Sequence, residues 1–188
     1  MKKIQLSLSA LVLFFIASLA FAHGPVRQDT DESIVIKAPA DKVWALIKDF
    51  GEMAWHPAIQ STENKGGNEK GATRVLTLKK GGTITEELKK YDADKMSYSY
   101  KITEMSTEKT INYAGKDENV PVLPVANYSA TITVTPQGDQ TTVQWKAGYY
   151  RAYTNNNPPE EMNETAANAA VKAVFTEGLN SLKVLAEQ

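Results

Sequence analysis

The sequence predicts an α+β domain in which a strongly curved antiparallel sheet of about seven strands wraps around one long C-terminal helix. Three observations predict it. A β-branched segment is followed by a helical one near the N-terminus, the middle of the chain holds several segments of alternating apolar and polar residues, and residues 158–188 are amphipathic with helical spacing. Strand, helix, a run of strands and a final helix is an α+β order.

The first elements follow from residue type. Residues 32–37 are rich in β-branched side chains and predict a strand, and Pro39 suits the first turn of a helix. Residues 41–50 carry apolar side chains at helical spacing. Residues 52–57, which end in proline, leave room for a second short helix of one turn. Two short helices are therefore expected after the first strand.

The middle of the chain alternates with a period of two, which predicts strands. The expected strands are residues 59–65, 74–78, 84–88, 96–102, 128–134 and 143–149. Residues 118–126 contain two prolines and are expected to form a loop or lid. In the final helix, the expected apolar stripe is Met162, Ala166, Ala169, Ala173, Leu182 and Leu185.

The register of one hairpin can be predicted from its turn. A three-residue turn with glycine in the left-handed conformation suits Gly81 and Gly82. The expected opposite pairs are Leu78 with Ile84, Leu76 with Glu86, and Arg74 with Leu88. This register gathers the large apolar side chains on one face together with Arg74 and Glu86. Because an unpaired buried charge is costly, we expect these two side chains to pair.

The N-terminus has the features of a secretory signal. Lys2 and Lys3 precede an uncharged stretch from residue 11 to 21, and Ala20 and Ala22 form the small-x-small pattern of a cleavage site. The apolar stretch is shorter than the roughly 20 residues that cross a bilayer, so no membrane anchor is expected after cleavage. We predict a signal peptide at residues 1–22 and a single periplasmic domain at 23–188.

Composition narrows the function. Without Lys2 and Lys3, 19 of the 21 basic residues remain against 22 acidic ones, and the charges are interleaved, so nucleic acid is not an expected partner. The absence of cysteine excludes thiol catalysis, thiolate-bound clusters and covalent haem. His23 could chelate copper at a new N-terminus, but His56 is the only other imidazole, so no metal site and no cofactor are predicted.

Several stretches resemble a known superfamily. They are Ala38-Pro39-Ala40-Asp41-Lys42-Val43-Trp44, Trp55-His56-Pro57, Gly81 to Leu88, and Pro124-Val125-Ala126-Asn127-Tyr128. With the element order, they resemble the START-like superfamily with its helix-grip fold, often described as polyketide cyclase/dehydrase and lipid transport. The resemblance covers nearly all of residues 23–188 and implies a cavity between the sheet and the final helix.

Within that superfamily the chain is most similar to the MxaD-type periplasmic proteins of methylotrophic bacteria. The shared stretches are His23-Gly24-Pro25, Tyr149-Tyr150-Arg151-Ala152-Tyr153 and Asn155-Asn156-Asn157-Pro158-Pro159. The resemblance implies a non-catalytic accessory role in methanol oxidation, with methanol dehydrogenase and a c-type cytochrome as partners. Two alternatives stay open: a carrier of a hydrophobic small molecule, and a cyclase or aromatase with Glu86 or His56 as acid or base.

The candidate ligand-binding residues are those expected on the concave face or near the cavity mouth. They are Trp55, His56, Arg74, Glu86, Tyr98, Tyr100, Tyr128, Trp145 and Tyr149. Polar anchors in an otherwise apolar pocket are typical of small-molecule sites. Core packing explains the same aromatic residues, and a buried ion pair explains Arg74 and Glu86 without a ligand. No nucleophile with an attached base is present, and no catalytic residue is predicted.

Overall fold

A computed structural model describes residues 24–188. The predicted signal at residues 1–22 and His23 lie outside this part of the chain. The strands are β1 (Gln28–Ile36), β2 (Ile59–Lys65), β3 (Thr73–Leu78), β4 (Thr83–Asp92), β5 (Ser97–Met105), β6 (Thr107–Tyr113), β7 (Lys116–Pro121), β8 (Val125–Gln137) and β9 (Gln140–Arg151). The helices are α1 (Ala40–Ile47), a 3₁₀ turn η1 (Glu160–Met162) and α2 (Glu164–Ala186).

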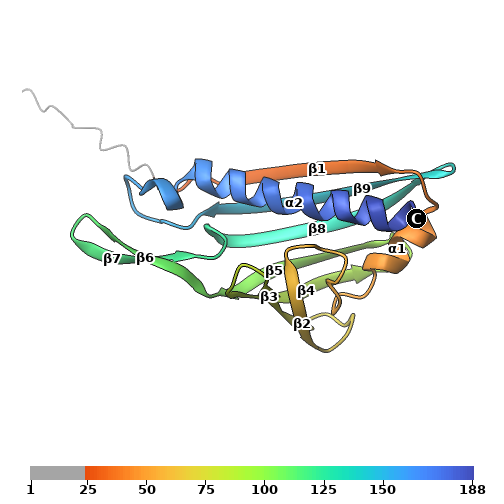
Figure 1. Cartoon of the computed structure of the whole chain (residues 1–188), viewed down its shortest axis with the longest axis horizontal. Coiled ribbons are helices and arrows are strands. Elements are labelled where there is room, and N and C mark those ends of the chain that lie inside the picture. Colours follow the sequence, from red (N-terminus) through yellow and green to blue (C-terminus); the bar gives the residue numbers. More distant parts are fainter. Residues whose placement is uncertain (1–23) are drawn as a thin grey trace, which may run out of the picture.

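Seven strands form one antiparallel sheet in the order β1-β9-β8-β5-β4-β3-β2. Figure 1 shows α2 running along the β1, β8 and β9 side of the curved sheet, with α1 near the C-terminal end of α2. The core lies between the concave face of the sheet and these two helices, and the sheet, α1 and α2 all contribute buried residues to it. The predicted α+β fold is therefore confirmed. Within residues 24–188, no helix is both long and apolar enough to cross a bilayer.

Two local expectations were wrong. Residues 52–57 form turns and not a second helix. One turn is closed by the hydrogen bond from His56 N to Met53 O, and Pro57 follows directly, so the segment is too short to continue as a helix. The expected lid at residues 118–126 is mostly strand: β7 runs to Pro121 and β8 begins at Val125. The β6–β7 hairpin, which extends beyond the sheet in Figure 1, was not predicted, because its mostly exposed polar side chains show no apolar alternation.

The register of the β3–β4 hairpin also differs from the prediction. Arg74 lies opposite Glu86 and Leu76 opposite Ile84, a shift of two residues. The turn closes one residue earlier than expected, with Leu78 N bonded to Gly82 O and Gly81 at φ 97°. A shift of two leaves every side chain on its predicted face. It brings the two charged residues directly opposite each other.

The apolar stripe predicted for the final helix was correct at Met162 and Leu182, which are buried, but out of phase at its other positions. Ala169 and Ala173 are exposed, and Leu185 is 38% exposed. The buried stripe is Ala167, Val171, Phe175, Gly178, Leu179, Leu182 and Ala186. Alanines occur on every side of this helix, so they mark its buried face poorly. Phe175, stacked on Trp145 with ring centroids 4.3 Å apart, sets the orientation.

Candidate functional site

A cavity of about 470 Å³ lies between the sheet and α2. Its volume is within the roughly 300–1,000 Å³ of typical small-molecule sites. Most of the wall is apolar and comes from β2, β3, β4, β5, α2 and two loops. Its apolar residues are Met53, Pro57, Ala58, Ile59, Leu76, Leu78, Ile84, Ile102, Val122, Leu123, Ala170, Ala173 and Val174. The polar or aromatic lining is His56, Lys79, Lys80, Glu86, Tyr100, Tyr128, Trp145 and Glu177.

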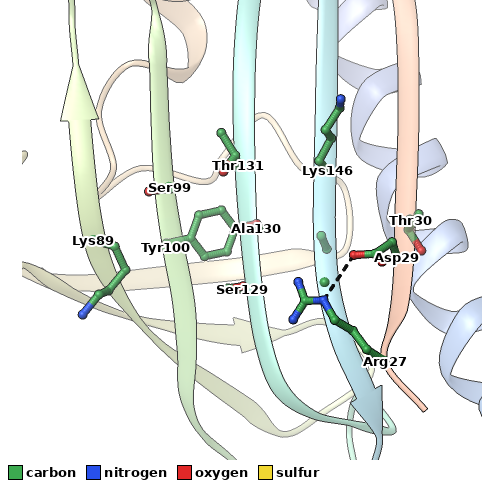
Figure 2. Close-up of a pocket in the computed structure, with 12 residues that line it drawn as sticks. Arg27, Asp29, Thr30, Lys89, Ser99, Tyr100, Ser129, Ala130, Thr131 and Lys146 are labelled. Atoms are coloured by element: carbon green, nitrogen blue, oxygen red, sulfur yellow. Dashed lines mark ion pairs between the residues drawn. The ribbon is translucent and has the colours of Figure 1, made fainter.

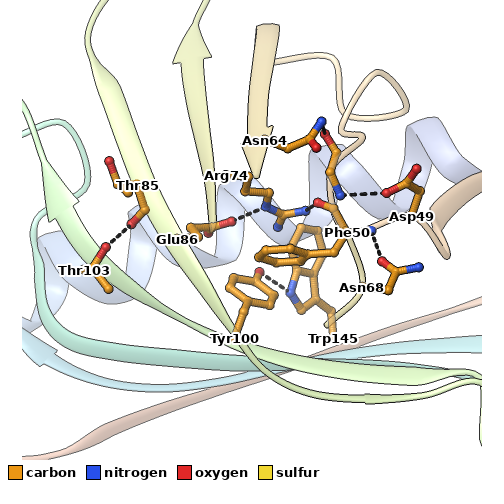
Figure 3. Close-up of polar contacts among 11 residues, drawn as sticks. Asp49, Phe50, Asn64, Asn68, Arg74, Thr85, Glu86, Tyr100, Thr103 and Trp145 are labelled. Carbon is orange, nitrogen blue, oxygen red and sulfur yellow. Dashed lines mark hydrogen bonds and ion pairs between the residues drawn. The ribbon is translucent and has the colours of Figure 1, made fainter. Parts of the chain in front are cut away.

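Glu86 contributes a carboxylate to the inner wall, and Arg74 supports it from behind. Arg74 Nε donates to Glu86 Oε2 at 2.6 Å, and Arg74 Nη1 donates to the Phe50 carbonyl at 2.8 Å (Figure 3). The guanidinium carbon lies 4.2 Å from the centroid of the Phe50 ring. Burial raises the pKa of the Glu86 carboxyl, and the charge of Arg74 opposes that rise. Arg74 itself does not line the cavity.

A cluster of aromatic side chains lies beside Glu86. Trp145 Nε1 donates to the Tyr100 hydroxyl at 3.0 Å, as Figure 3 shows. The ring of Tyr128 is next, with its centroid 6.3 Å from that of Tyr100. Burial raises the pKa of both tyrosines far above the usual value. Both phenols therefore keep their protons at neutral pH and can donate hydrogen bonds.

His56 is held by the backbone on both sides of its ring. Its Nε2 donates to the Val174 carbonyl on α2 at 3.0 Å, and its Nδ1 accepts from Ala58 N at 3.2 Å. This pattern requires a neutral imidazole with the proton on Nε2. Burial lowers the pKa of His56, which favours the neutral form. Both nitrogens are used in the fold, so His56 is not a free acid or base in this structure.

Gly178 allows α2 to approach this corner. A Cβ atom at position 178 would lie 2.6 Å from His56 Cδ2 and 2.9 Å from a ring carbon of Trp145. Those distances are shorter than van der Waals contact, so only glycine fits without a shift. Gly178 could not be recognised from the sequence as a contact site, because a glycine inside a helix gives no sign of which neighbour it accommodates.

Of the nine candidate residues, His56, Glu86, Tyr100, Tyr128 and Trp145 line the cavity. The other four lie behind it or elsewhere in the core. Trp55 packs against His56 and Trp145, and within the described chain its buried Nε1 has no hydrogen-bond partner. Tyr98 packs between Trp44 and Phe50 near α1. Tyr149 is tied by its hydroxyl to Thr30 and Asn168.

Most of the apolar lining, and most of the lining residues from α2, were not predicted from the sequence. Ala173 belongs to the predicted stripe and lines the cavity, whereas Ala170, Val174 and Glu177 lie outside that stripe and line it too. Val122 and Leu123 belong to the segment that the proline content marked as a loop or lid, and both line the cavity. That composition was the available signal for them.

A second, shallow groove of about 420 Å³ crosses the outer face of the sheet (Figure 2). Its charged groups are paired. Arg27 lies 3.5 Å from Asp29, Lys146 lies 3.2 Å from Asp31, and Lys89 lies 3.1 Å from Glu87. No apolar wall encloses a ligand there. The cavity under α2 is therefore the candidate site.

The family described as polyketide cyclase / dehydrase and lipid transport matches residues 27–187. The chain belongs to this family. No curated protein matches the sequence. Membership of the polyketide cyclase / dehydrase and lipid transport family agrees with the observed sheet and C-terminal helix.

Solved structures share the fold of this family member. An uncharacterized protein from Bacillus thuringiensis is 25% identical, with a TM-score of 0.63 over 84% of this chain and 97% of that one. The ZhuI aromatase/cyclase from Streptomyces sp. R1128 is 15% identical, with a TM-score of 0.63 over 86% and 94%. Norcoclaurine synthase from Thalictrum flavum, in complex with dopamine and hydroxybenzaldehyde, is 15% identical, with a TM-score of 0.57 over 100% and 95%.

Proposed function

We propose that the protein binds a small, mostly apolar molecule in the cavity under α2, with one hydrogen-bonding group of the ligand beside Glu86 and Tyr128. The observation that carries the proposal is the cavity itself: about 470 Å³, apolar along most of its wall, with a few polar groups at its inner end. This combination is the usual form of a small-molecule site.

The inner end offers both an acceptor and a donor. Within residues 24–188, the hydrogen bond that Glu86 accepts comes from Arg74 and uses Oε2, which leaves Oε1 for a ligand. Tyr128 keeps its proton and lies within electrostatic range of Glu86. A hydroxyl group on the ligand could donate to Glu86 and accept from Tyr128. Satisfying both groups offsets the cost of removing them from water.

Calorimetric titration tests the proposal with two neutral probes, 12-hydroxydodecanamide and 6-hydroxy-2-naphthamide. We expect at least one of them to bind the protein purified without its signal. Ala170→Phe should abolish that binding, because Ala170 lines the cavity and a phenyl ring would fill it. The matched control is Ala169→Phe, at an exposed position on the same helix that does not line the cavity.

Circular dichroism shows whether both variants keep the fold. Failure of both probes to bind, or full binding by a folded Ala170→Phe variant, would reject the proposal. The periplasmic location and the accessory role beside methanol dehydrogenase and a c-type cytochrome stay predictions from the signal and from the resemblance. The cavity proposal does not depend on either of them.

A further inference from the structure

Three charged side chains stand at the opening of the cavity, separate from the buried pair inside. Lys79 and Lys80 belong to the β3–β4 turn, and Glu177 projects from α2. All three are exposed and line the cavity. Among residues 24–188, none of the ion pairs involves any of them. Two cations and one anion therefore give the opening a net positive charge.

The turn that carries the lysines is held in place. Lys79 N donates to the Ala58 carbonyl at 2.9 Å, and Leu78 N donates to the Gly82 carbonyl at 3.0 Å. Both glycines of the turn have positive φ, 97° for Gly81 and 84° for Gly82, so its shape depends on them. The two ammonium groups are thereby kept at the rim, where flexible stems let them reach a ligand group.

The inner end of the cavity disfavours an anionic ligand group, unlike the opening. Glu86 presents a carboxylate there, and Arg74, which balances its charge, lies behind it and outside the cavity lining. An anionic group at the inner end would meet Glu86 in a poorly solvated space, where like charges repel strongly. The cavity is thus electrically polarised along its depth, with an acceptor inside and cations at the rim.

We propose that the ligand carries an acidic group, which stays at the cavity opening beside Lys79 and Lys80 while the apolar body points inward. This inference rests on the proposed function, because it concerns the same cavity. The shared chemistry is a carboxylate on an apolar body. An aliphatic acid and an aromatic acid both satisfy it, and the experiment separates them.

The test compares each acid with its neutral amide by calorimetric titration at low ionic strength. The pairs are 12-hydroxydodecanoate with 12-hydroxydodecanamide, and 6-hydroxy-2-naphthoate with 6-hydroxy-2-naphthamide. We expect the preferred acid to bind roughly threefold to tenfold more tightly than its amide, as for partly exposed charge pairs. The advantage should shrink in about 0.5 M salt, which screens exposed charges. The pair with the larger advantage identifies the aliphatic or aromatic source.

Variants assign the effect to the rim. Lys79→Gln/Lys80→Gln should remove the preference for the acid, so that the variant binds the acid and its amide with equal affinity. The matched control is Lys65→Gln/Lys70→Gln, which removes the same charge from two exposed lysines that do not line the cavity. Glu177→Gln should strengthen acid binding, because it removes the opposing charge. These three results together would support the inference.

The two proposals fail in different ways. If the amides bind and the acids bind no more tightly, the cavity function stands and the acidic-ligand inference is overturned. The inference is also overturned if the rim variant and the lysine control change acid binding equally, because net charge alone would then explain the effect. If no probe of either kind binds, both proposals are rejected.

Discussion

Arg74 and Glu86 face each other across β3 and β4, with 2.6 Å between Arg74 Nε and Glu86 Oε2, and only 1% and 5% of these residues exposed. The attraction between the two charges offsets the free-energy cost of dehydrating them only while both partners are present. The pair connects fold and site, because it holds the carboxylate that lines the cavity.

Removing one partner should therefore harm the fold more than removing both. Arg74→Leu is expected to lower the free energy of unfolding by about 3–5 kcal/mol, because Glu86 is left buried and unpaired. Arg74→Leu/Glu86→Leu should recover most of this loss, short of about 1–3 kcal/mol for the Phe50 carbonyl that loses its donor. Urea denaturation measures both. A double variant that is no more stable than Arg74→Leu would contradict the pairing argument.

Gly178→Ala tests the close approach of α2. At an ordinary helix position this change adds up to about 1 kcal/mol of stability. Here the new methyl group would overlap His56 and Trp145, so we expect a net loss of about 1–3 kcal/mol instead. Asn180→Ala, at an exposed position of the same helix, is the matched control and should be neutral or stabilising. Thermal unfolding distinguishes the two, and a stabilised Gly178→Ala variant would disprove the clash.

His56 should make stability depend on pH. Burial lowers its pKa in the folded protein below the ordinary 6.5, and the bond to Val174 offsets this only in part. Between these two pKa values the unfolded chain binds more protons than the folded chain. The free energy of unfolding therefore falls as the pH drops below 6.5, until the pH passes below the folded-state pKa.

The measurement is a series of urea denaturations from about pH 7.5 to about pH 5. His56→Gln should be less stable at the upper end, because a ring nitrogen contact is lost, but its stability should change less across this range. The control is His23→Gln, which alters the only other histidine and should keep the original pH dependence. Equal slopes for His56→Gln and the unmodified protein would assign the effect to other groups.

The predicted signal gives a direct test of processing. Expression of the full chain in a bacterial host should yield a mature protein that begins at His23, since Ala20 and Ala22 meet the requirements of the cleavage site. Intact-mass measurement of the periplasmic fraction checks this. Ala22→Phe should leave the precursor uncleaved, and a cytoplasmic protein that keeps residues 1–22 would refute the prediction.

Several features could be read from the sequence because they depend on local periodicity. Alternation with a period of two assigned Arg74, Glu86, Tyr100 and Tyr128 to one face, and all four are buried there. The assignment was correct although the predicted register was not, because a shift of two residues keeps each side chain on the same face of the sheet. The strand order along the chain and the final helix followed from the same periodicities.

Other features were decided only by the tertiary structure. The sequence could not show which candidate residues reach the cavity, since Tyr98 and Tyr100 share a face and both pack on Phe50, yet of these two only Tyr100 lines the cavity. The rotation of α2 depended on Phe175 stacking against Trp145, a contact between residues 30 positions apart in the chain. Periodicity determines which side of an element is buried. What that side packs against, and where space remains, depends on shapes contributed by distant segments.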